Sequence, residues 1–256
     1  MWMWIFSLSQ APHFQAQSYV SGLQVYPQNR NSSELYSLDE PGPGQNRDHV
    51  KRTIFFFRKH FLAVPKLERL HQGLLGPCAS KALNQNSQTC FLFALEPGKA
   101  ISFSDWQPEP YNCEEEKAKG AKSEAPCPED FERHLVDQGR DAEHNLYINC
   151  IATDLDDRRA LDGTLDLTYY PRKQGMALGF FEEEDIGSGN VISPLVAIQI
   201  SPTRAYVKDQ ILEIECKAYF KGVRHVLGEG VVKFKVQFNN ASHDPISDYE
   251  AHDEFE

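Results

Sequence analysis

Three segments in the second half of the chain carry an apolar residue at every second position, and this period of two restricts the fold more than any other feature. They cover residues 146–152, 211–220 and 231–238. Such alternation is typical of strands with one buried and one solvated face, as antiparallel sheets permit. Two shorter apolar runs, at 89–95 and 195–201, indicate further strands. The chain is therefore predicted to be mainly β.

Two cysteines lie on the predicted buried faces of these strands. Cys150 alternates in phase with Leu146 and Ile148, and Cys216 is in phase with Leu212 and Ile214. A bridge between the two cysteines would lie inside the protein and could tie two sheets together, as in an immunoglobulin-like sandwich. Closing so long a loop is worth roughly 4 kcal/mol in chain-entropy terms.

The six cysteines are an even number, and no two of them have the C-x-x-C spacing of zinc sites and redox motifs. They are Cys78, Cys90, Cys113, Cys127, Cys150 and Cys216. Three disulfides fit this pattern better than a metal site, and reduced cysteines in a cytosolic protein are the alternative. A bridge that closes the charged segment 113–127 is plausible. Sequons at Asn31 and Asn240 also favour an extracytoplasmic location.

The first half of the chain is less regular. Residues 11–47 are rich in Gln, Ser, Pro, Gly and Asn and predict an extended connector. From Asp48, which can cap a helix, apolar residues recur at helical spacing, so we expect a helix of about four turns that ends before Pro65. The domain of sheets and flanking helices is predicted to span 48–241, followed by an acidic tail at 242–256.

The chain begins with an apolar run, Met1 to Leu8, that a soluble domain does not require. It is too short to span a bilayer, which needs about 20 apolar residues, and it lacks the charged start of a secretory signal. Two interpretations remain open. Residues 1–10 are either an amphipathic start that packs on the protein or the outer end of a membrane helix whose first part is missing.

Charge and motifs exclude several classes of function. The net charge of -11 repels nucleic-acid phosphates and anionic lipid heads. The sequence contains no G-x-S-x-G, H-E-x-x-H or P-loop motif, so we expect no catalytic residues, no cofactor, no metal and no small-molecule substrate. A secreted hydrolase whose site no motif reveals is the remaining enzymatic alternative.

Five segments in order resemble the β subunits of sodium/potassium-transporting ATPases, and the invertebrate forms look closest. They are "WQPEPYN" (106–112), "YYPRKQG" (169–175), "SPLVAIQI" (193–200), "IECKAYFKGV" (214–223) and "GVVKFKVQF" (230–238). The resemblance implies a single-pass plasma-membrane glycoprotein, held by a signal-anchor helix, with an extracellular immunoglobulin-like ectodomain. Residues 1–10 then resemble the exoplasmic end of a truncated membrane helix. If the truncation is real, the chain would be secreted or misprocessed.

The resemblance also implies specific pairs and contacts. Cys150 with Cys216 matches the last disulfide of the family, and Cys78 with Cys90 matches the pair before the "FLFAL" strand. Cys113 with Cys127 is an extra pair, and the first disulfide of the family is missing. The aromatic segment that precedes the "PLVAV" strand in the family appears here as Gly179 to Glu183. The residues expected at the partner contact, with core packing as their alternative, are Tyr169, Tyr170, Phe180 and Phe181.

Two functions follow from the resemblance. The first is that of a non-catalytic accessory subunit that escorts the catalytic α subunit, assists its folding and membrane delivery, and tunes its potassium affinity, while ion transport and ATP hydrolysis belong to α. The second is that of an extracellular adhesion or interaction module that has lost pump association. The second is favoured by the missing anchor, the altered aromatic segment and the acidic tail.

Overall fold

The computed structural model describes the sandwich and the elements packed on it. The described residues are 22–27, 35–39, 46–60, 73–79, 82–83, 89–96, 110–127, 132, 145–154, 164–171, 175–177, 195–203 and 210–239. Residues 1–10 and the predicted acidic tail at 242–256 lie outside these ranges. No helix within the described ranges is both long enough and apolar enough to cross a bilayer.

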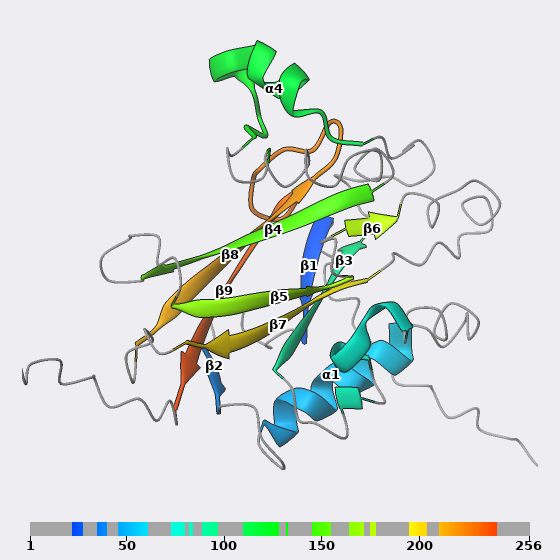
Figure 1. Cartoon of the computed structure of the whole chain (residues 1–256), viewed down its shortest axis with the longest axis vertical. Helices are drawn as coiled ribbons and strands as arrows, with labels where there is room; N and C mark the ends of the chain where they lie inside the picture. Colours follow the sequence, from blue (N-terminus) through cyan, green and yellow to red (C-terminus); the bar gives the residue numbers. More distant parts are fainter. Residues whose placement is uncertain are drawn as a thin grey trace, which may run out of the picture.

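Nine described strands form two sheets (Figure 1). The first sheet has the order β1-β3-β7-β5 and the second the order β2-β9-β8-β4-β6. Neighbouring strands are antiparallel except β2 and β9, which are parallel. The strands of the first sheet are β1 (Gly22–Tyr26), β3 (Cys90–Glu96), β7 (Val196–Pro202) and β5 (Leu165–Tyr170). Those of the second are β2 (Leu35–Leu38), β9 (Val231–Phe238), β8 (Leu212–Tyr219), β4 (Asn145–Asp154) and β6 (Gly175–Ala177). The predicted mainly β sandwich is thus confirmed.

The main core lies between the two sheets, and the alternating strands supply it as predicted. In β8 the apolar positions, Ile214 among them, are buried, whereas Glu213 and Glu215 lie on the outer face. There Lys233 of β9 forms ion pairs with both glutamates, at 3.4 Å and 2.5 Å. This face of the second sheet is therefore a charged surface, which is why the sequence alternates.

A second core lies on the outer face of the first sheet, where helix α1 (Arg47–His60) covers β3 (Figure 1). Cys90, Leu92 and Ala94 of β3 face this core, while Phe91 and Phe93 face the other sheet. Because β3 is buried on both faces, its sequence is a continuous apolar run rather than an alternation. The helix matches the predicted four turns, but Asp48 lies in its first turn instead of preceding it.

The structure corrects the predicted boundary at residue 48. The range 11–47, expected to be an extended connector, contains β1 and β2, and these strands join the first and the second sheet. Both are short, and each pairs with a strand far away in sequence. Their own residues therefore carry little signal, and the partner strands β3 and β9 complete their hydrogen bonding.

All three expected disulfides are present: Cys78–Cys90, Cys113–Cys127 and Cys150–Cys216. The last one corrects a prediction. Cys150 and Cys216 are register partners on β4 and β8, which are neighbours in one sheet, so their bridge does not join the two sheets. The alternation places each cysteine on the buried face of its own strand. It leaves open which sheet each strand joins.

Tyr169 makes the contact between sheets that was expected of that disulfide. Its ring is buried, and its hydroxyl oxygen on β5 accepts a hydrogen bond from the backbone N–H of Cys150 on β4 at 2.9 Å. Burial raises the pKa of Tyr169 to about 12, although the bond from Cys150 opposes this shift. Tyr169 is therefore a core residue that holds one sheet against the other.

Replacing Tyr169 by phenylalanine is expected to lower the free energy of unfolding by about 1–3 kcal/mol, because the buried N–H of Cys150 loses its acceptor. Urea denaturation of the purified chain measures this. Tyr170→Phe is the matched control, since the Tyr170 hydroxyl donates to Gln199 at 3.3 Å in a half-buried place. An equal loss in both variants would contradict the assigned role of Tyr169.

Candidate functional site

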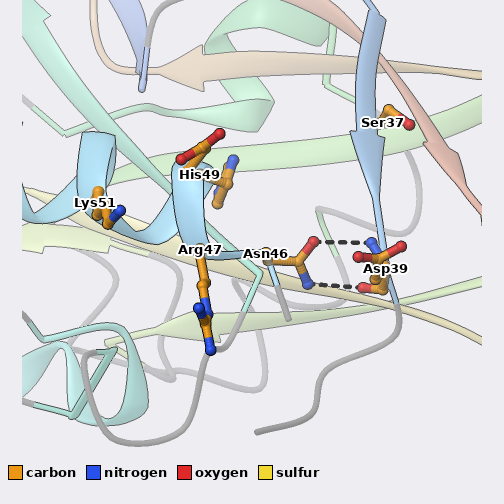
Figure 2. Close-up of a pocket in the computed structure, with 7 residues that line it drawn as sticks. Ser37, Asp39, Asn46, Arg47, His49 and Lys51 are labelled. Atoms are coloured by element: carbon orange, nitrogen blue, oxygen red, sulfur yellow. Dashed lines mark hydrogen bonds between the residues drawn. The ribbon is translucent and has the colours of Figure 1, made fainter. Parts of the chain in front are cut away.

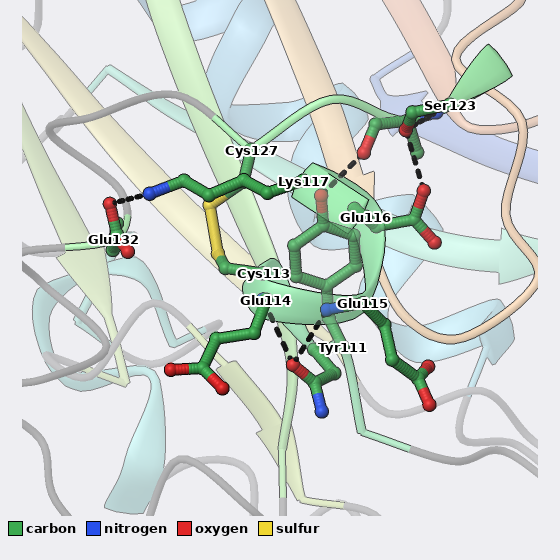
Figure 3. Close-up of a disulfide and its surroundings, with 11 residues drawn as sticks. Tyr111, Cys113, Glu114, Glu115, Glu116, Lys117, Ser123, Cys127 and Glu132 are labelled. Atoms are coloured by element: carbon green, nitrogen blue, oxygen red, sulfur yellow. Dashed lines mark hydrogen bonds and ion pairs between the residues drawn. A yellow bond between two sulfur atoms is a disulfide. The ribbon is translucent and has the colours of Figure 1, made fainter. Parts of the chain in front are cut away.

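A disulfide-closed projection lies beyond one end of the sandwich (Figures 1 and 3). It comprises residues 110–127 and contains helix α4 (Cys113–Lys119) and the 3-10 turn η2 (Gly120–Lys122). The Asn112 side-chain oxygen caps α4 by accepting hydrogen bonds from the backbone N–H groups of Glu114 and Glu115, at 3.0 Å and 3.2 Å. The sequence analysis predicted the bridge that closes this segment but missed the helix. Its signal was the capping asparagine followed by three glutamates.

Buried contacts fasten the projection to the sandwich. The Tyr111 ring packs edge-on against Tyr219 of β8, with ring centroids 5.2 Å apart. The Tyr111 hydroxyl donates to the carbonyl of Ala125 within the projection and so fixes the ring in place. The backbone N–H of His225 donates to the carbonyl of Glu124 at 2.9 Å, and the His225 ring packs against Tyr219 as well. Burial raises the pKa of Tyr111, so its phenol stays protonated and can keep donating.

Glu116 connects the helix to the rest of the projection (Figure 3). Burial raises its pKa, but hydrogen bonds from Lys119 and Ser123 outweigh this and hold the pKa below its usual range. The carboxylate therefore stays charged and braces the turn after α4. The outward side chains of α4 and η2 are exposed and of both signs: Glu114, Glu115, Lys117, Lys119 and Lys122.

The projection offers charged side chains for contacts with other molecules. Within the described ranges, no three His, Cys, Asp or Glu side chains lie close enough together to hold a metal ion. The projection presents charge on a braced scaffold, which is the arrangement expected of a protein-binding surface.

A polar pocket of about 410 Å³ lies where β2 meets the start of α1 (Figure 2). The amide of Asn46 joins the two elements, because its oxygen accepts from the N–H of Asp39 and its nitrogen donates to the carbonyl of Asp39, both at 2.8 Å. The lining residues are Ser37, Asp39, Asn46, Arg47, Asp48, His49 and Lys51. No pattern in the sequence indicates this pocket. Asp39 and Asn46, which are 7 positions apart, both lie in the segment expected to be a connector.

His49 is the buried member of this lining. Its Nε2 atom lies 2.8 Å from the carbonyl oxygen of Cys90, and its ring packs against Phe91. Burial lowers the pKa of His49 to about 4; the bond to Cys90 opposes this shift and the charge of Arg52 adds to it. His49 is thus neutral in the folded chain at neutral pH.

The stability of the chain is expected to fall in acid through His49. The unfolded chain binds a proton at this histidine near pH 6.5, whereas the folded chain does so only near pH 4. The contribution is therefore complete above pH 6.5 and is lost as the pH falls toward 4. Between pH 7.5 and 5 the loss is about 2 kcal/mol. Urea midpoints over this range should shift less in His49→Gln than in the parent, and an equal shift would refute the assignment.

The structure does not bring the expected contact residues together as one described surface. Tyr169 is in the core, and Tyr170 is half-buried near the second core. Phe180 and Phe181 lie outside the described residues, as do the sequon asparagines Asn31 and Asn240. The projection and the pocket are the surfaces that sequence reasoning did not single out.

Comparison with protein families places most of the chain within one family model. Residues 1–238 match the family model described as "Sodium / potassium ATPase beta chain". The matched range ends at the last residue of β9 and so contains every described strand, all three disulfides and the projection. No curated protein matches the chain.

Proposed function

The chain belongs to the sodium/potassium ATPase beta chain family, and we propose that it is the non-catalytic β subunit of a P-type Na⁺/K⁺-exchanging ATPase. In this role it assists the folding, membrane delivery and K⁺ affinity of the catalytic α subunit. The observation that carries the proposal is the family match over residues 1–238. The disulfide-bonded sandwich supports an extracellular position, because disulfides persist in oxidising compartments.

The proposal includes a location and a contact. The chain is anchored in the plasma membrane with its C-terminal ectodomain outside the cell, and it carries N-glycans at Asn31 and Asn240. Tyr170, Phe180 and Phe181 contribute to the contact with α. Since Tyr169 is buried between the sheets, its part in that contact is indirect.

Co-expression tests the proposal. The chain is expressed in eukaryotic cells with a Na⁺/K⁺-ATPase α subunit, and α is recovered by immunoprecipitation through the chain in mild detergent. We expect recovery of α, more α at the cell surface than without the chain, and reduced recovery for Phe180→Ala/Phe181→Ala. A glycosidase-induced shift in mobility, absent from Asn31→Gln/Asn240→Gln, tests the glycans. No recovery of α by a folded, surface-delivered chain would contradict the proposal.

An extracellular interaction module derived from the same family is the second candidate. The extra bridge Cys113–Cys127 favours it, because this bridge holds a charged projection beyond the sheets. Aggregation of cells that express the chain, without recovery of α, is the result that supports this candidate.

A further inference from the structure

We propose that the acidic tail, residues 242–256, folds back onto the exposed basic face of helix α1 in the same chain. This contact concerns the chain alone and does not depend on association with an α subunit.

The exposed side of α1 is basic, with one aromatic residue in its middle. We define the basic face as Arg47, Lys51, Arg52, Phe55 and Arg58, all of them exposed. Arg47, Lys51 and Phe55 follow one another at intervals of four, so they lie in one row along the helix. Phe55 is 70% exposed, although the rings of the neighbouring residues Phe56 and Phe57 pack inward. A basic row around an exposed ring fits an acidic segment that also has apolar side chains.

The tail has this composition. It contains no Lys or Arg, and its acidic residues are Asp244, Asp248, Glu250, Asp253, Glu254 and Glu256. Ile246, Tyr249 and Phe255 lie among them. In a chain with a net charge of -11, the basic face is where such a tail meets attraction rather than repulsion.

The last described residue before the tail, Asn239, lies near the start of the helix. Asn239, which follows β9, is held on β2: its N–H donates to the carbonyl of Leu38, and its side-chain oxygen accepts from the Ser37 hydroxyl, both at 2.8 Å. The Asn239 amide nitrogen lies 3.4 Å from a carboxylate oxygen of Asp39. Ser37 and Asp39 line the pocket that Arg47 and Lys51 line from the other side (Figure 2). Asn239 is therefore held at the wall of this pocket.

Length and tethering permit the contact. The 14 residues of α1 extend about 21 Å, whereas the 15 tail residues reach about 50 Å when extended. Exposed ion pairs are individually weak, so no single pair holds the tail. Attachment at Asn239 gives the tail a high effective concentration at the helix, and several weak pairs then act together. The acidic residues Asp39 and Asp48 line the same pocket and weaken the attraction there. They do not cancel it, because the basic face carries Arg47, Lys51, Arg52 and Arg58.

Competition between an attached and a free tail tests the inference. A labelled peptide of residues 243–256 is titrated into the full chain and into a chain that ends at Ser242, which keeps every described element and the Asn240 sequon. Fluorescence anisotropy at low salt should show saturable binding to the shortened chain and at least tenfold weaker binding to the full chain. High salt should abolish binding.

Charge reversal locates the contact. In the shortened chain, Arg47→Glu/Lys51→Glu should weaken peptide binding at least tenfold. Lys119→Glu/Lys122→Glu on the projection, which makes the same change in charge, should alter it less than twofold. A peptide with lysines in place of the acidic residues 248, 250, 253 and 254 should bind the Arg47→Glu/Lys51→Glu chain better than the parent. The inference is overturned if the peptide binds neither chain, binds both equally, or responds equally to both double variants.

Discussion

Replacing Cys216 by serine is expected to remove most of the folded, secreted protein. Cys216 is fully buried, and its bridge to Cys150 closes a loop of 66 residues. Losing the bridge costs about 4 kcal/mol in chain entropy, and the serine hydroxyl placed in the core costs a further 1–3 kcal/mol or so. Together these approach the whole stability of an ordinary domain, which is about 5–15 kcal/mol. The test uses the chain expressed behind a cleavable secretory signal, so that folded protein reaches the medium, and pulse-chase labelling of cells and medium measures the secreted fraction.

Cys113→Ser is the control for this prediction. Its bridge closes a loop of 14 residues in the projection, so its loss costs about 3 kcal/mol in chain entropy, and the sandwich keeps its own bridges. The paired variants Cys150→Ala/Cys216→Ala and Cys113→Ala/Cys127→Ala repeat the comparison without an unpaired thiol. If both pairs reduced secretion equally, the Cys150–Cys216 bridge would not be the main covalent support of the sandwich.

Gly22→Ala is expected to lower the free energy of unfolding by more than about 3 kcal/mol, for two reasons that act together. Gly22 has a φ of +108°, which side-chain-bearing residues rarely adopt. A Cβ there would also lie 2.4 Å from the carbonyl oxygen of Glu229 and 2.6 Å from its Cα. The same carbonyl accepts the N–H of Leu23, so the backbone cannot withdraw without losing that bond.

Gly222→Ala separates the two causes. Gly222 also has a positive φ, +80°, but no heavy atom lies within 4 Å of the added Cβ. This variant should therefore show the conformational strain alone, about 1–2 kcal/mol. Urea denaturation of the three chains measures the difference. Equal losses would mean that the contact of Gly22 with Glu229 can relax, and that β1 is held less closely than the structure indicates.

The local pattern of residues predicts which segments of the second half become strands and which of their faces are buried. The period of two in β4, β8 and β9 follows from burial on one face, and each strand carries that signal in its own residues. Helix α1 could be predicted for the same reason, because Val50 and Phe57 recur at helical spacing and face the second core. The resemblance to the β subunits then supplied two of the disulfide pairs, Cys78–Cys90 and Cys150–Cys216.

The arrangement of the strands depends on contacts between distant parts of the folded chain. Alternation shows that a strand is half-buried but not which strand lies beside it, so the Cys150–Cys216 bridge was expected between sheets and lies within one. β1 and β2 have only 5 and 4 residues, and they are strands because β3 and β9 pair with them. The position of Asn239 beside the pocket depends on its bonds to Ser37 and Asp39, across about 200 residues of chain. Contacts between residues so far apart are set by the whole fold, and no local pattern encodes them.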